Sequence, residues 1–148
     1  MRAVLQVEPY TAERLGELVS ARLERQSVIG HAYITAIIDQ HVLERPVGTP
    51  AIMAEQCGHL AIMAGRPDIG LHVIPEGTNV GLWGAFDIAA RDSAVTVRFS
   101  ALEDMTSTAS DTVGKMTVAF ERILGAALPR AESLTLIRTM EEQWKTRI

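Results

Sequence analysis

An almost continuous apolar run in the first third of the chain places the strongest constraint on the fold. Residues 33–39 read Tyr-Ile-Thr-Ala-Ile-Ile-Asp, and only Thr35 interrupts the apolar character before Asp39. β-Branched and aromatic side chains favour strands, and a strand with so few polar positions is typical of burial on both faces. We therefore expect a strand at the centre of a sheet here, with helices packed nearby.

Helices are predicted on both sides of this strand. After it, Thr49 offers a capping hydroxyl, Pro50 suits the first helical position, and Gly65 marks the end. One face of that helix is expected to carry Met53, Cys57, Leu60 and Ala64. Before the strand, an amphipathic helix ending near Gly30 carries Leu15, Leu18, Val19 and Leu23 at helical spacing.

The remaining two thirds of the chain alternate in the same way. Strands are expected over residues 69–75, 83–89 and 94–99, with the last two forming a hairpin. Helical periodicity returns from about Ser110 and is broken by Pro129. The final helix is expected to carry Leu134, Ile137, Met140, Trp144 and Ile148 on one stripe.

Length and composition fit a single folded domain over residues 1–148. Hydrophobic residues make up 47% of the chain and charged residues 22%, which are ordinary globular values. Helices flanking a block of strands define an α+β fold. We expect a small, mostly antiparallel sheet of three to four strands flanked by about four helices.

The charge balance and the apolar runs exclude several classes of partner. With 14 Lys and Arg against 18 Asp and Glu, the net charge is −4 and no basic cluster offers a nucleic-acid footprint. No run reaches the roughly 18 apolar residues of a membrane span, and no secretory signal is apparent. Cys57 is the single cysteine, which agrees with a reducing compartment. A cytoplasmic protein is expected.

Titratable residues offer no strong catalytic or metal-binding pattern. Cys57 and His59 are two apart on a predicted helix, so they point to nearly opposite sides. Glu55 and His59 share a helical face, which would allow a proton-transfer pair. An exposed contact between the two side chains is the simpler interpretation. Asp39 and His41 suggest a structural hydrogen bond. The four histidines lack the paired spacing of zinc sites, so no metal and no cofactor are predicted.

A pocket for an apolar small molecule is the functional hypothesis that the composition allows. Residues 77–84 match no nucleotide-binding fingerprint and are interpreted as a flexible loop leaving a strand. Six methionines and a few aromatic residues could line an adaptable pocket, although the same side chains would equally form an ordinary core. The predicted ligand-binding residues are Tyr33, Met53, Gln56, His72, Trp83 and Phe86.

Short segments in a fixed order over almost the whole chain resemble a known family. Val-Leu-Gln-Val at residues 4–7 precedes Tyr10, and Arg-Leu-Glu-Arg-Gln follows at residues 22–26. Further matching positions are residues 38–43, 45–48, Gln56 with His59-Leu60, and residues 73–75, 84–86 and 132–134. Together they resemble the domain that follows a xenobiotic-response-element-type (XRE) helix-turn-helix in actinobacterial regulators, a domain regarded as antitoxin-like or of unknown function. The resemblance implies a homodimer.

Departures from the family pattern bear on what the resemblance implies. Met1 stands just before the first family segment, so we expect the helix-turn-helix, and direct DNA binding with it, to be absent. Gln40 stands where the family pattern has the acidic residue of an Asp-Glu pair, and Val7 stands where it has threonine. The polar contact made by that lost carboxylate is not expected here.

Two functions from different classes follow. The first, slightly favoured, is a cofactor-independent biosynthetic enzyme of the cyclase, cycloaddition or isomerase type, because positioning an apolar substrate alone lowers a reaction barrier. No catalytic residue is assigned. The alternative is an effector-binding or dimerisation module of a transcriptional regulatory system. An exposed apolar stripe on the first or last helix would favour an adaptor or dimerising role, whereas a closed Met- and Trp-lined cavity would favour the enzyme.

Overall fold

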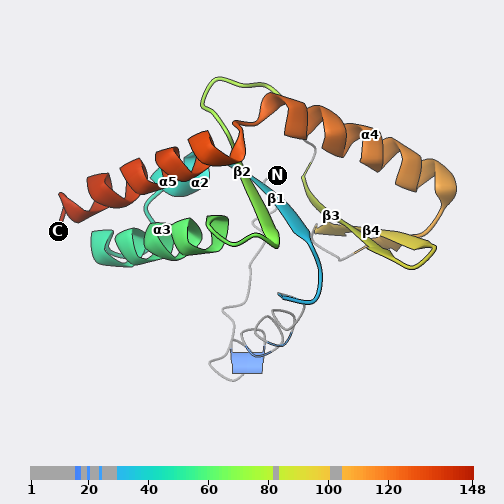
Figure 1. Cartoon of the computed structure of the whole chain (residues 1–148), viewed down its shortest axis with the longest axis horizontal. Coiled ribbons are helices and arrows are strands. Elements are labelled where there is room, and N and C mark those ends of the chain that lie inside the picture. Colours follow the sequence, from blue (N-terminus) through green and yellow to red (C-terminus); the bar gives the residue numbers. More distant parts are fainter. Residues whose placement is uncertain (1–15, 18–19, 21–23, 25–29, 82–83, 101–104) are drawn as a thin grey trace, which may run out of the picture. The chain divides into compact units, whose positions relative to one another are not determined.

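The computed structural model forms two compact units, residues 1–34 and residues 35–148. In the first unit, Gly16, Glu17, Ser20 and Glu24 are helical and exposed, in agreement with the helix expected before Gly30. The apolar residues predicted for the inner face of that helix lie outside the described residues. The structure describes residues 16–17, 20, 24, 30–81, 84–100 and 105–148 (Figure 1).

The predicted α+β class is confirmed, with the strands divided between two sheets. β1 and β2 form a two-stranded parallel sheet, and β3, β4 and β5 form a three-stranded antiparallel sheet in that order. The described elements are β1 (Ile34–Asp39), α2 (His41–Glu44), α3 (Pro50–Ala64), β2 (Ile69–Ile74), β3 (Ala85–Arg91), β4 (Ala94–Ser100), β5 (Met105–Ser107), α4 (Ser110–Ala126) and α5 (Arg130–Lys145).

Helices α3 and α5 lie side by side and enclose much of the core (Figure 1). As predicted, the Thr49 hydroxyl caps α3, accepting a hydrogen bond from the Ile52 backbone N–H at 3.4 Å, and the helix ends at Gly65. The Trp144 indole N–H on α5 donates to the Leu43 backbone carbonyl at 2.7 Å, which ties the short helix α2 to α5. Between the two long helices the buried side chains are Met53, Cys57, Ala61, Ile137, Met140 and Trp144.

The most deeply buried strand is β2, not β1. The first strand is half-buried along its whole length, so the expectation of burial on both faces is wrong for this strand. In β2, Leu71, Val73 and Ile74 are almost completely enclosed. The backbone carbonyl of Val73 accepts a hydrogen bond from the Leu128 N–H at 2.8 Å, which fastens the α4–α5 connection to β2.

The hairpin predicted after residue 83 is formed by β3 and β4. Phe86 pairs with Phe99 in the register, two positions from Ile88 and the fully buried Val97. These alternate side chains lie on the more buried face of the strands, and α4 packs against both strands. The two-residue turn places Asp92 at φ 54°, a left-handed conformation that aspartate tolerates. Within the described ranges, every helix is too short or too polar to span a bilayer.

Candidate functional site

The residues predicted to line a pocket occupy dissimilar environments. Met53 is buried in the core on α3, whereas Gln56 on the same helix is exposed. Tyr33 is 64% exposed. Phe86 is half-buried in the hairpin, and Trp83 lies outside the described residues. Within the second unit, Met53, Gln56, His72 and Phe86 thus range from buried to exposed, and a pocket that includes Tyr33 or Trp83 stays a prediction.

His72, another predicted pocket residue, takes part in a structural junction. Its Nδ1 lies 2.9 Å from the Leu128 backbone carbonyl, and because a carbonyl only accepts, Nδ1 must carry a proton. The Ser133 hydroxyl donates to the same carbonyl at 3.0 Å. It also accepts from the Val73 backbone N–H at 3.0 Å. The half-buried imidazole therefore helps to hold the α4–α5 connection against β2.

Cys57 is an inert thiol in the α3–α5 core. Burial raises the pKa of the Cys57 thiol, and the negative charge of Glu141 raises it further. A raised pKa disfavours the thiolate, which is the nucleophilic form. His59 is exposed while Cys57 is buried, so the predicted separation of the two side chains is confirmed.

The Asp39–His41 hydrogen bond is confirmed, but in a different setting from a strand face. The Asp39 carboxylate accepts from the His41 backbone N–H at 2.9 Å and lies 3.0 Å from its Nδ1. His41 begins α2, so Asp39 stops the strand and supports the first turn of that helix.

Gln40 makes contacts that the acidic residue of the family pattern could not all reproduce. Its amide N–H donates to the Glu44 carboxylate at 2.6 Å. Its amide oxygen accepts from the Glu76 backbone N–H at 3.1 Å. A glutamate at position 40 could accept but could not donate, and it would face Glu44 with a like charge. Gln40 therefore bridges α2 and the loop after β2.

Shallow hollows lie on the outer faces of the last two helices. One lies on α5, among the exposed side chains of Thr135, Arg138, Thr139 and Glu142. A second lies on α4, around Asp111, Gly114, Lys115 and Val118. In the part of the chain that the structure describes, no group of three His, Cys, Asp or Glu side chains could hold a metal ion.

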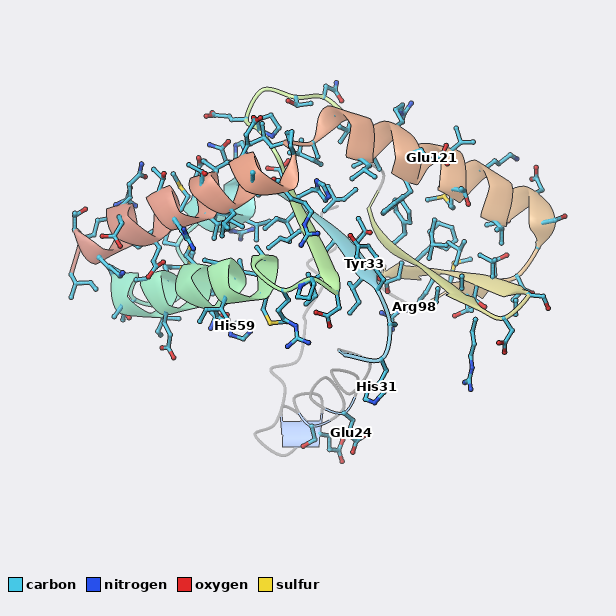
Figure 2. All side chains as sticks on the ribbon, viewed as in Figure 1. Glu24, His31, Tyr33, His59, Arg98 and Glu121 are labelled. Atoms are coloured by element: carbon cyan, nitrogen blue, oxygen red, sulfur yellow. The ribbon has the colours of Figure 1, made fainter. Side chains whose placement is uncertain are left out.

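The surface feature that stands apart is the side of α3 that faces away from the core. We call Ile52, Glu55, His59 and Ile62 the α3 outer face. At 100° per residue these four side chains fall within an arc of about 80°, opposite the positions packed on α5. Figure 2 shows His59 on the side of α3 away from α5. All four residues are exposed, including Ile52 at 47% and Ile62 at 73%.

The α3 outer face is apolar at both ends although it meets water. Apolar side chains on the solvent side of a helix whose opposite side is already buried are typical of a helix that packs on a second partner. Val47, 64% exposed, adjoins the first turn of α3, because its backbone N–H donates to the Met53 sulfur at 3.4 Å. Sequence reasoning missed this surface, although Ile52 and Ile62 fall outside the predicted buried face of α3 and were a readable signal.

Comparison with family models gives one match, to a domain of unknown function (DUF5753), over residues 1–139. The chain belongs to this family. The comparisons with curated proteins and with solved structures found no match.

Proposed function

We propose that the protein is a dimerisation module of a regulatory system, of the kind found with XRE-type helix-turn-helix regulators in actinobacteria, and that it associates through the α3 outer face. The single observation that carries the proposal is the exposure of Ile52 and Ile62 on a helix whose opposite side forms the core. Covering such side chains removes apolar area from water, the main driving force of protein association.

An enclosed catalytic site for an apolar metabolite has less support. Two of its predicted polar groups, Tyr33 and Gln56, are exposed, and a third, His72, is engaged with a backbone carbonyl. A ligand site needs a few polar groups that converge on one concave space. In the second unit, Gln56 faces solvent and His72 bonds to a backbone carbonyl, so neither supports such a space.

The test is the solution mass of wild type and Ile62→Lys, followed by sedimentation velocity from low to high micromolar concentration. Wild type is expected to sediment as a dimer at the upper end. Each dimer buries Ile62 twice, and losing about 1.5 kcal/mol at each copy weakens dimerisation roughly 100-fold. Ile62→Lys should therefore sediment as a monomer. Because Ile62 is 73% exposed, the fold should be unaffected.

Val118→Lys provides the matched control, since Val118 is an apolar side chain on α4 with 66% exposure. This variant should dimerise like wild type. A wild type that stays monomeric at every concentration, or an Ile62→Lys variant that dimerises as wild type does, would refute the proposed function.

A further inference from the structure

We propose that two copies of the chain pair α3 against α3 in antiparallel orientation, a proposal that rests on the dimerisation function. The two-fold axis crosses the outer side of α3 at the level of position 57 along the helix. In this arrangement Ile52 contacts Ile62 of the second copy, and the Glu55 carboxylate accepts a hydrogen bond from the His59 imidazole of the second copy. Each contact occurs twice, as a two-fold interface requires.

The spacing of the α3 outer face selects this register. Ile52 and Ile62 lie five residues on either side of position 57, and Glu55 and His59 lie two residues on either side of it. An antiparallel helix pair centred there matches apolar with apolar and acidic with basic. One axis therefore satisfies both pairs. The 3-4-3 spacing of the four residues is that of a helix–helix seam.

Other arrangements of the same helix are less favourable. A parallel pair would place the Glu55 carboxylates opposite each other, and like charges across an interface oppose association. An antiparallel pair shifted by one helical turn would place an isoleucine opposite a charged side chain. Neither alternative uses both the apolar and the charged positions.

The side chains at the centre of the seam are free to make these contacts. Within the described part of the chain, neither Glu55 nor His59 forms a hydrogen bond or an ion pair, and both are exposed. At the end that meets Ile62 of the second copy, Ile52 lies beside Gly48, since a Cβ on Gly48 would lie 3.0 Å from the Ile52 Cδ1.

Disulfide trapping with two single-cysteine substitutions tests the register. Ile52→Cys and Ile62→Cys are prepared separately in the full chain and oxidised at high protein concentration, each alone and as an equal mixture. The antiparallel register brings position 52 to position 62 of the second copy, whereas identical positions lie about 15 Å apart along the axis. Because a disulfide needs Cα atoms within about 7 Å, the mixture should cross-link roughly tenfold faster than either variant alone.

Peptide mapping of the cross-linked product identifies the bond, and wild type, which has only the buried Cys57, is the control. A disulfide between positions 52 and 62 supports the proposal. If Ile52→Cys cross-links to itself as fast as the mixture does, the pairing is parallel and the register is wrong while dimerisation stands. A dimeric wild type without any cross-link also overturns the register. A wild type that sediments as a monomer overturns the dimerisation function itself.

Discussion

The side chain of Ser133, on α5, joins β2 to the α4–α5 connection. It has no exposed surface, and its hydroxyl bonds to the backbone of both Val73 and Leu128. Replacing it with alanine leaves the buried Val73 N–H without that partner, at a cost of about 1–3 kcal/mol. We expect Ser133→Ala to lower the free energy of unfolding by about 2 kcal/mol in a denaturant titration.

Thr135→Ala is the control for this prediction. The Thr135 hydroxyl is exposed and donates to a carbonyl of its own helix, so its loss should change stability by less than about 0.5 kcal/mol. Equal destabilisation by the two substitutions would contradict the role assigned to Ser133.

At the residue scale, the sequence predicted how neighbouring residues lie relative to each other, but not which distant residues contact each other. The positions of Cys57 and His59 on different sides of α3 follow from helical geometry alone. The Asp39–His41 contact was predictable because the two residues are only two positions apart, although it forms where β1 ends and α2 begins. The Leu128 carbonyl that His72 contacts is 56 residues away. No local pattern carries that information, because it depends on how α5 docks on β2.

At the scale of elements, local signals located most of the helices and strands. Thr49, Pro50 and Gly65 bounded α3, and the hairpin and both C-terminal helices appeared where periodicity placed them. The short elements α2 and β5 were missed, since four and three residues carry too little periodicity to detect. The division of the strands into two sheets was missed as well, because strand pairing is set by long-range packing.

Two glycines with open surroundings should respond oppositely to alanine. Gly114 lies inside α4, and Gly77 lies in a loop at φ +80°; a Cβ at either position would meet nothing within 4 Å. Gly114→Ala should stabilise the protein by about 0.5–1 kcal/mol, because alanine is the better helix former. Gly77→Ala should destabilise it by about 1–2 kcal/mol, because a left-handed conformation is strained for alanine.

Thermal unfolding of the two variants measures both effects on the same background. The Tm should rise for Gly114→Ala and fall for Gly77→Ala. A common sign would mean that factors other than backbone conformation decide the outcome.

At the scale of the whole molecule, the sequence favoured an interior ligand pocket, whereas the proposal drawn from the structure rests on the α3 outer face. Met53 and Phe86 were grouped because both are apolar, yet Met53 packs between α3 and α5, and Phe86 pairs with Phe99 in the β3–β4 hairpin. Which apolar side chains of α3 stay exposed depends on where α5 packs, and composition cannot supply that. The same helix therefore contributes both to the core and to the proposed interface.

Charge reversal across the α3 outer face tests the central claim most directly, with dimer dissociation constants measured by sedimentation equilibrium. Glu55→Lys removes the carboxylate that accepts from His59 of the second copy, and His59→Glu places two carboxylates together. With two exposed pairs per dimer, each worth up to about 1 kcal/mol, either change should weaken dimerisation roughly 5- to 30-fold.

The double variant Glu55→Lys/His59→Glu reverses both partners and should return the dissociation constant close to that of wild type. Glu121→Lys, on α4 (Figure 2), carries the same change of net charge as Glu55→Lys and should leave dimerisation unaltered. Restoration in the double variant is the result predicted here. A double variant that dimerises more weakly than either single variant would contradict an antiparallel α3 interface.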